Sequence, residues 1–296
     1  AETAQTYFAL RGAQRRLALA KENLAAADEV LGVIELLFEN GRQNGVDFAR
    51  ARAQRSSLAA NLPQREAELV AQEQRLAVLT AQPVAALREQ VGDAATFPEL
   101  PTLVTAGTPE TWLQRRPDII AAERRLAAAR NDVGEEIAQY FPKLFLDGAF
   151  GWTGQVANVL GDRDAERWQW GPSLTWRFLD FGRVRQNVKA AEARADGSVA
   201  AYRETVLRAL EETENALAGY RASNRAAIEL GNAADAAKEA SRLSRLRFEA
   251  GADDALTLLQ TEQTRIDLED ASVQAQTSRT TALAALYKAV AGDFAE

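Results

Sequence analysis

The sequence of 296 residues contains neither cysteine nor histidine, and both absences restrict the chemistry that the protein can perform. Without cysteine, neither disulfides nor thiolate metal sites are available. Without histidine, the commonest general base and the commonest metal ligand are missing. Catalysis would have to depend on Asp, Glu, Lys, Ser or Tyr, and no glycine-rich phosphate loop or nucleophile motif organises them. We therefore predict that the protein is not an enzyme and uses no cofactor and no metal.

The sequence also lacks an excess of positive charge and any long apolar run, and both absences exclude a class of protein. Lysine and arginine number 35 against 42 acidic residues, which gives a net charge of -7 and a sequence pI near 5.1. A nucleic-acid-binding protein needs a basic face for the phosphates, so we expect no nucleic-acid partner. No run of eighteen or more apolar residues occurs, so the sequence predicts no transmembrane helix. Because no Met and no signal peptide open the sequence, we expect an N-terminal portion before Ala1.

The clearest local pattern is an alternation of apolar and polar residues from Trp168 to Phe178. This period of two predicts a strand with one apolar and one polar face. A partner strand is predicted over 143–152, and the polar loop 153–167 lies between the two. Strands of this length match a tilted strand that crosses a bilayer. A water-soluble hairpin that packs its tryptophan face on a helix is the alternative. The residues predicted to face the membrane are Leu144, Leu146, Phe150, Trp152, Trp168, Trp170, Leu174, Trp176 and Phe178.

Long helices are predicted on both sides of this hairpin. Leucines recur every seven residues from Leu10 to Leu31, the series ends at Phe38, and small or apolar residues follow three positions after each leucine. Such a heptad seam is typical of helices that pack side by side. A second helical stretch, from about Gly182 to Ala250, has its own seam with spacings of three and four. A generic coiled coil is the alternative explanation of these helices. The predicted seam of the second stretch comprises Ala195, Val199, Tyr202, Val206, Ala209, Thr213, Ala216 and Tyr220.

An internal repeat connects the helices. Phe38-Glu39-Asn40-Gly41 recurs as Phe248-Glu249-Ala250-Gly251, and a short polar stretch and another alanine-rich helix follow each glycine. Glycine suits the end of a helix because it adopts the left-handed conformation without a side-chain penalty. Each copy is thus predicted to be a helix, a tight turn and a returning helix. Two unrelated glycine-capped helix ends are the alternative.

Residues 81–117 hold five of the eight prolines and are predicted to be irregular. Pro117 and Asp118 suit the first turn of the helix that follows, because a helix N-terminus tolerates proline and favours an acid. The sequence thus predicts a mainly α fold with a membrane β-hairpin.

At this point the sequence resembles the TolC-like outer-membrane efflux proteins, particularly their NodT-type branch. The segments that carry the resemblance are RRPDIIAAERRLAAARNDVG (115–134), YFPKLFLDGAFGW (140–152), FLDFGRVRQNVKAAEARAD (178–196), LEETENALAGY (210–220), RFEAGADDALTLLQTEQ (247–263) and the closing ALYKAVAG. They follow one another in order over essentially the whole chain.

The resemblance implies long antiparallel helices that form part of a trimeric α-barrel plus β-barrel duct. It implies a location in the Gram-negative outer membrane, with the helical barrel extending into the periplasm. The implied partners are two further copies in a homotrimer, a periplasmic adaptor (membrane fusion) protein, an inner-membrane transporter and outer-membrane lipid. The chain then divides into a first periplasmic helical hairpin (1–80), an irregular equatorial segment (81–117), a helix leading to the membrane (118–141), a transmembrane β-hairpin (142–180) and a second periplasmic helical hairpin with the C-terminus (181–296).

The two glycine turns are, by this resemblance, the periplasmic tips that meet the adaptor and close the channel at rest. Leu256 matches a place where relatives have an apolar constriction, and Gln260 a place where they often have an acidic residue. Asp47, Asp253 and Asp254 would then supply negative potential, unless these three acids belong to a solvated turn or a helix N-cap. The implied docking tips are Gly41, Arg42, Gln43, Asn44, Gly45, Val46, Gly251, Ala252, Asp253, Asp254 and Ala255, and the implied constriction is formed by Leu256, Gln260 and Asp47.

The sequence departs from this family in having one predicted β-hairpin where members have two per subunit. Six strands from three copies are fewer than the eight of the smallest bacterial barrels. The resemblance therefore implies that the first hairpin lies before Ala1, that this chain is roughly the last two thirds of a subunit, and that it forms no pore alone. A soluble periplasmic coiled-coil adaptor or scaffold is the alternative, although it leaves the tryptophan-rich hairpin unexplained.

Overall fold

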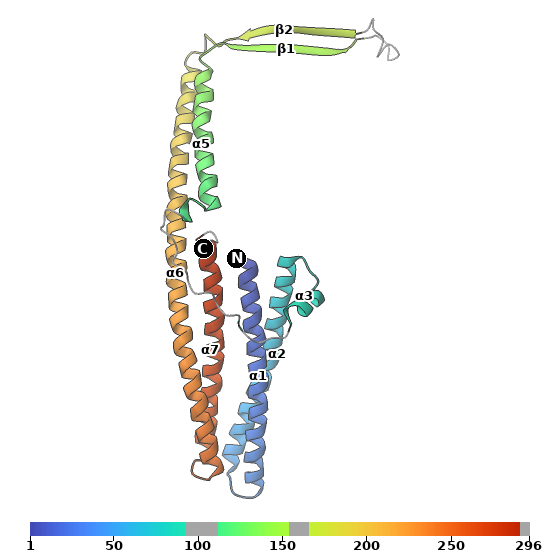
Figure 1. The fold of residues 1–296 in the computed structure, drawn as a ribbon, viewed down its shortest axis with the longest axis vertical. Coiled ribbons are helices and arrows are strands. Elements are labelled where there is room, and N and C mark those ends of the chain that lie inside the picture. Colours follow the sequence, from blue (N-terminus) through green and yellow to red (C-terminus); the bar gives the residue numbers. More distant parts are fainter. Residues whose placement is uncertain (93–96, 98–111, 154–165, 291–296) are drawn as a thin grey trace. The chain divides into compact units, whose positions relative to one another are not determined.

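The computed structural model describes residues 1–92, 97, 112–153 and 166–290. Its elements are the helices α1 (Glu2–Glu39), α2 (Gly45–Thr80), α3 (Val84–Val91) and α5 (Pro117–Ala138), the strands β1 (Lys143–Trp152) and β2 (Glu166–Thr175), and the helices α6 (Arg183–Glu249) and α7 (Ala255–Ala289). They form two compact units (Figure 1). The first contains Ala1–Trp112 and Leu210–Glu296, and the second contains Leu113–Ala209.

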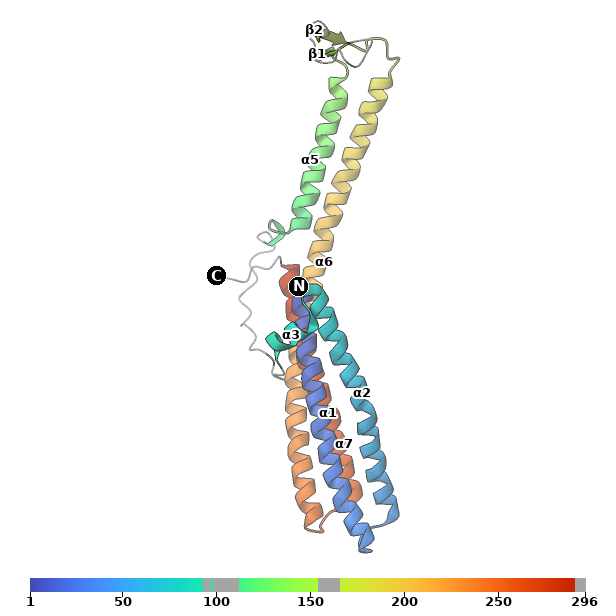
Figure 2. The ribbon, with the colours of Figure 1, turned by 90° about the vertical axis from the view of Figure 1, so that its right-hand side faces the viewer.

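The first unit is built from two helical hairpins, α1 with α2 and α6 with α7. Helix α1 packs against both α2 and α7, and Figures 1 and 2 show the turns of the two hairpins at the same end of the unit. The predicted seam of α1 is confirmed, because Leu10, Ala13, Leu17 and Ile34 are buried, although Phe38 is 41% exposed. Every residue of the predicted α6 seam is buried or half-buried. The periodic spacing therefore identified the contact faces of both helices.

A second buried stripe on α1 was not predicted. It contains Gly12, Leu19, Asn23 and Val30, which lie between the heptad positions. Gly12 is packed so closely against α7 that a Cβ atom added to it would lie 2.2 Å from Oγ1 of Thr277. Helix α1 thus buries two faces because it lies between two neighbours.

The segment predicted to be irregular contains a helix, which corrects that expectation. Helix α3 follows Pro83, whose fixed φ of -62° suits the start of a helix, and Leu87 of α3 packs on Leu10, Leu76 and Ala77. Residues 93–96 and 98–111 of this segment lie outside the described residues.

The second unit contains α5, the β-hairpin and the first part of α6. Pro117 occupies the first turn of α5, as predicted, and Asp118 accepts two hydrogen bonds from Arg116, 3.0 Å from Nε and 2.8 Å from Nη2. Both views show α5 lying beside this part of α6 (Figures 1 and 2). Strands β1 and β2 pair antiparallel from Lys143 with Thr175 to Trp152 with Glu166.

The end of β2 differs from the prediction. The strand begins at Glu166, two residues before the predicted start, and ends at Thr175. Trp176 and Phe178 therefore lie beyond the strand, although they continue its alternation in the sequence. The reason is that β1 begins at Lys143, the partner of Thr175, and offers no strand residue for Trp176 to pair with. The predicted loop residues 154–165 lie outside the described residues.

Candidate functional site

The turn between α1 and α2 has the hydrogen bonds of a Schellman motif. The N–H of Gly41 donates to the carbonyl of Phe38 at 2.9 Å, and the N–H of Arg42 donates to the carbonyl of Leu37 at 2.8 Å. Gly41 has a φ of +66°, which is the left-handed conformation that favours glycine. The glycine therefore ends α1 and reverses the chain, as the sequence predicts.

The turn between α6 and α7 repeats this geometry. Gly251 has a φ of +73°, and its N–H donates to the carbonyl of Phe248 at 2.9 Å. The N–H of Ala252 donates to the carbonyl of Arg247 at 2.8 Å. The sequence repeat is thus a structural repeat, and the alternative of two unrelated helix ends is not needed.

The repeat continues into the helices that follow. The side chain of Asn44 accepts hydrogen bonds from the N–H groups of Val46 at 2.9 Å and Asp47 at 3.0 Å. Asp254 caps α7 in the same way, by accepting from the N–H of Thr257 at 2.8 Å. Hydrogen bonding from the side chain of Thr257, and from its backbone N–H, lowers the pKa of Asp254. Each turn thus contains a glycine that ends one helix and a polar side chain that starts the next.

The second turn carries an ion pair that the first turn lacks among the described residues. Arg247 donates from Nε and Nη2 to the two carboxylate oxygens of Asp253, at 2.9 and 2.8 Å. These hydrogen bonds lower the pKa of Asp253 and raise that of Arg247. The carboxylate of Asp253 is therefore ionised but already paired with a cation of its own turn.

Asp47 lies in a buried position at the start of α2. It is only 7% exposed, and its carboxylate accepts a hydrogen bond from Nδ2 of Asn44 at 2.8 Å and one from Arg50 at 3.5 Å. Asp47 is therefore neither a solvated turn residue nor the N-cap of α2, which is Asn44. It lies in the first turn of the helix and accepts a hydrogen bond from the capping side chain.

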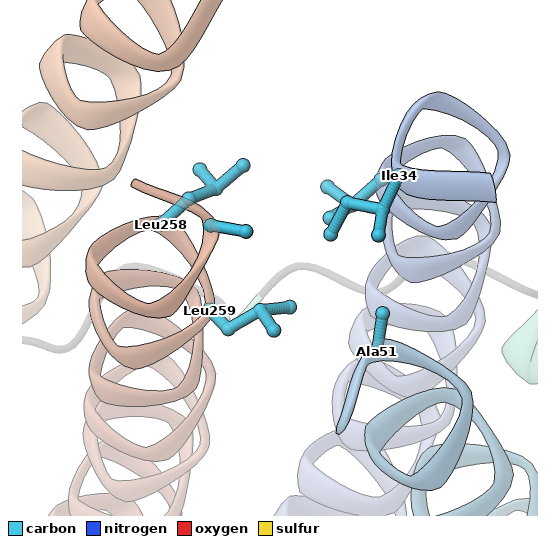
Figure 3. Close-up of a cluster of buried hydrophobic side chains, with 6 residues drawn as sticks. Ile34, Ala51, Leu258 and Leu259 are labelled. Carbon is cyan, nitrogen blue, oxygen red and sulfur yellow. The ribbon is translucent and has the colours of Figure 1, made fainter. Parts of the chain in front are cut away.

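An apolar cluster joins the two turns from beneath. It comprises Val30, Ile34, Ala51, Ala255, Leu258 and Leu259, with Leu31, Phe48 and Phe248 at its edge. Figure 3 shows Leu258 and Leu259 of α7 projecting toward Ile34 of α1 and Ala51 of α2. The rings of Phe38 and Phe48 stack at 5.3 Å between centroids beside the first turn. The two turns therefore form one packed end of the unit.

Leu256 and Gln260 occupy a different face of α7 from this cluster. They are four residues apart and so lie one above the other on the helix. Leu256 is half-buried and Gln260 is exposed, whereas Ala255, Leu258 and Leu259 are buried. Val46, at the corresponding end of α2, is 59% exposed. Neither Leu256 nor Gln260 belongs to the buried cluster between the two hairpins, and Gln260 is open to solvent.

A buried carboxylate, Glu262, was missed by the sequence analysis. It is 5% exposed, and it accepts hydrogen bonds from the hydroxyl of Ser241 at 2.7 Å and from Nε of Arg265 at 3.0 Å. Burial raises its pKa, but the Ser241 hydrogen bond and the Arg265 charge outweigh burial and lower the pKa overall. The sequence does contain a pattern that indicates burial of Glu262. Glu262 follows Leu259 by three residues and precedes Ile266 by four, which is the heptad spacing of a buried face.

Neighbours of Glu262 extend the network to α1. Arg265 also donates to Oδ1 of Asn23 at 3.0 Å, and Arg245 bridges Glu262 and Glu29, at 3.3 Å from each. The Glu262 cluster, defined as Glu262 with Ser241, Arg245, Arg265 and Asn23, therefore connects α6, α7 and α1.

A second ionic cluster connects α1, α2 and α7 further from the turns. Arg16 donates from Nε and Nη2 to both carboxylate oxygens of Asp270 at 2.8 Å each, and Arg65 approaches the same carboxylate at 3.4 Å. The Arg16 hydrogen bond lowers the pKa of Asp270, and the same bond raises the pKa of Arg16. Both clusters thus hold one helical hairpin against the other.

The β-hairpin places the predicted apolar side chains on one face. Leu144 lies opposite Leu174, Gly148 opposite Trp170, and Phe150 opposite Trp168, and residues directly opposite in an antiparallel pair project to the same side. All nine predicted membrane-facing residues are at least 46% exposed, so the tryptophan face packs on none of the helices that the structure describes. The soluble-hairpin alternative required such packing.

Two other features are not found in the part of the chain that the structure describes. None of the helices in the described residues is long and apolar enough to span a membrane. Within that same part of the chain, no three His, Cys, Asp or Glu side chains gather as a metal site would require.

Comparison with known proteins gives a consistent result. Residues 108–292 match the family model described as "Outer membrane efflux protein". Outer membrane protein OprJ of Pseudomonas aeruginosa is 33% identical over 302 residues, which cover all of this chain and 62% of OprJ. Nodulation protein T of Rhizobium leguminosarum bv. trifolii is 29% identical over 258 residues, covering 87% of this chain and 55% of that protein.

A solved structure agrees in fold. The outer-membrane channel OprN is 35% identical and superimposes with a TM-score of 0.81, covering 99% of this chain and 65% of OprN. The chain therefore spans about three fifths of the length of the curated relatives it matches. Of the proteins named here, OprN is described as an outer-membrane channel and OprJ as an outer membrane protein.

Proposed function

Since the chain belongs to the outer membrane efflux protein family, we propose that it is part of a subunit of an outer-membrane exit duct. In this proposal three subunits form the duct, which is a passive conduit without catalysis. A periplasmic adaptor protein docks on it, and an inner-membrane transporter supplies the energy. The observation that carries the proposal is the exposed apolar face of the β1–β2 hairpin, on a chain whose helices form two glycine-turned hairpins.

The hairpin supports a membrane role through its length and its side chains. Each strand has ten residues, which matches a tilted strand across the hydrocarbon layer. Trp168 and Trp170 are 70% and 68% exposed, and in water such a surface would be costly. We propose that this face contacts lipid, that 142–180 is the membrane segment, and that 1–80 and 181–296 are the periplasmic hairpins on either side of the 81–117 and 118–141 segments.

The two turns are the proposed docking tips. Their backbone is fixed by glycine caps and polar N-caps, so they offer a rigid surface to the adaptor. We propose that Leu256 and Gln260 line the channel, because both lie outside the buried cluster of Ala255, Leu258 and Leu259. A ring of Gln260 side chains would be neutral, and the Asp253 charge is paired with Arg247. Cations should therefore be held only weakly at this entrance.

Extraction of the complete protein tests the proposal against its alternative. An outer-membrane duct should sediment with the outer membrane, require detergent for release and migrate as a trimer. A soluble periplasmic scaffold would be released by osmotic shock without detergent. Recovery in the soluble periplasmic fraction would contradict the proposal.

Replacing Leu256 by Ser should raise the resting single-channel conductance of the complete protein. The half-buried leucine is proposed to narrow the closed end, and a serine is smaller and hydrated. The measurement is conductance in planar bilayers, with Leu243→Ser on the exposed side of α6 as control. Unchanged conductance in Leu256→Ser, or an equal rise in the control, would remove Leu256 from the constriction.

A further inference from the structure

A groove of about 420 Å³ lies where β2 leads into α6. Two of its lining residues, Arg177 and Arg183, carry positive charge, and one, Asp180, carries negative charge, so the lining has a net charge of one positive unit. The complete lining comprises Trp176, Arg177, Phe178, Leu179, Asp180, Phe181, Arg183, Val184 and Asn187. The groove thus combines guanidinium groups with large apolar side chains.

Asp180, the single acidic residue of the groove lining, already accepts hydrogen bonds from the backbone. Asp180 accepts hydrogen bonds from the N–H of Gly182 at 3.1 Å and from the N–H of Val184 at 2.7 Å, and so caps α6. Both Arg177 and Arg183 are exposed, and neither forms a salt bridge with a carboxylate of the described residues. Their donors are therefore available to an anion from outside the chain.

The apolar walls are unusually exposed for side chains of this size. Phe181 is 96% exposed, and Phe178 and Leu179 are each 70% exposed. A cluster of this kind is costly in water and indicates contact with another apolar phase or molecule. The ligand should accordingly be both anionic and apolar.

The position of the groove relative to the hairpin identifies the kind of ligand. Trp176 is the first residue after β2, and its indole N–H donates to the carbonyl of Tyr140 at 3.1 Å, next to the start of β1. Tryptophan and tyrosine are enriched where the hydrocarbon layer meets the headgroups. If the hairpin crosses the bilayer, the groove lies at the headgroup level on the side of the helices.

We propose that this groove binds an anionic phospholipid from the leaflet on the side of the helices. Arg177 and Arg183 bind the phosphate, which a guanidinium group can contact with two parallel hydrogen bonds. Phe178, Leu179 and Phe181 contact the upper part of the acyl chains. The inference rests on the proposed function, since it requires that the hairpin lie in a membrane.

The test uses the complete, delipidated trimer in a neutral detergent. Native mass spectrometry measures the binding of short-chain phosphatidylglycerol, which is anionic, and of phosphatidylcholine, which is neutral overall. Each basic residue beside an anionic headgroup strengthens binding by about fivefold, so the double variant Arg177→Gln/Arg183→Gln should bind phosphatidylglycerol roughly twentyfold more weakly. Its binding of phosphatidylcholine should change much less.

Arg185→Gln is the matched control, because Arg185 is an exposed arginine of the same segment that does not line the groove. It should bind phosphatidylglycerol as the unchanged protein does. Equal affinity in the double variant would overturn the inference. Competition by inorganic phosphate at concentrations that match phosphatidylglycerol would overturn it as well, because a free phosphate site would then suffice. Normal conductance in planar bilayers, measured alongside, would show that the duct proposal survives such a result.

Discussion

Replacing Glu262 by Ala should lower the free energy of unfolding by about 3 kcal/mol, because breaking a buried ion pair leaves charges without compensation. Glu262 is 5% exposed, and Arg265, its closest cation, is also largely buried. The figure is at the low end for such changes because Arg265 keeps its contacts with Asn23 and Glu269. Thermal unfolding of the complete protein, followed by far-ultraviolet circular dichroism, should show a Tm lower by about 3–5 °C.

The matched control for this change is Glu239→Ala. Glu239 pairs with Arg242 one turn along α6, but both side chains are more than half exposed, and solvent screens such pairs. Its Tm should hardly change. The variant Glu262→Gln keeps an acceptor for the Ser241 hydroxyl and removes the charge, so its Tm should lie between those of Glu262→Ala and the unchanged protein. A Tm for Glu262→Ala equal to that of Glu239→Ala would show that the Glu262 cluster does not hold the hairpins together.

Replacing Gly12 by Ala should destabilise the protein, although the same change usually stabilises a helix. An added Cβ would lie 2.2 Å from Oγ1 and 2.7 Å from Cγ2 of Thr277. The hydroxyl of Thr277 is held by the carbonyl of Val273 at 2.9 Å, so its rotation would lose a hydrogen bond. Overpacking of this kind costs about 2 kcal/mol. The Tm of the complete protein should fall by about 2–3 °C.

Gly32 provides the opposite expectation on the same helix. Nothing lies within 4 Å of the Cβ that an alanine would add there, so Gly32→Ala should raise the stability by about 0.5–1 kcal/mol.

Adding Thr277→Ala to Gly12→Ala removes the two atoms closest to the new Cβ and should restore most of the lost stability, which a double-mutant cycle measures. If Gly12→Ala raises the Tm as Gly32→Ala is expected to do, the close approach of α1 and α7 is refuted.

Local patterns in the sequence were sufficient for the turns and for the hairpin face. A glycine followed by a polar residue three positions later predicts a reversal wherever it occurs, because the left-handed conformation and the N-cap depend on neighbouring residues only. Both copies adopt the same backbone, with Gly41 and Gly251 at positive φ. The alternation around Trp168 and Trp170 likewise specifies which side chains share a face, because successive residues of a strand project to opposite sides.

Local patterns were insufficient wherever a second helix changes the environment of a residue. Asp47 looks like an exposed turn residue in the sequence, but it is only 7% exposed in the structure. Strand β2 was extended too far toward Phe178, because alternation continues in the sequence after the partner strand has ended. The roles of the tip and constriction residues remain proposals.

What the sequence by itself determined are the features that repeat along one element: the heptad seams of α1 and α6, the paired glycine turns and the two-faced hairpin. The tertiary structure alone decided which residues meet across elements, namely Gly12 with Thr277, Glu262 with Ser241, and Arg16 with Asp270. The physical reason is that periodicity reports which side of a helix is buried. How closely two helices approach, and whether a buried charge has a partner, depend on pairs of residues that are far apart in the chain. The separation is 21 positions for Ser241 and Glu262 and 265 positions for Gly12 and Thr277.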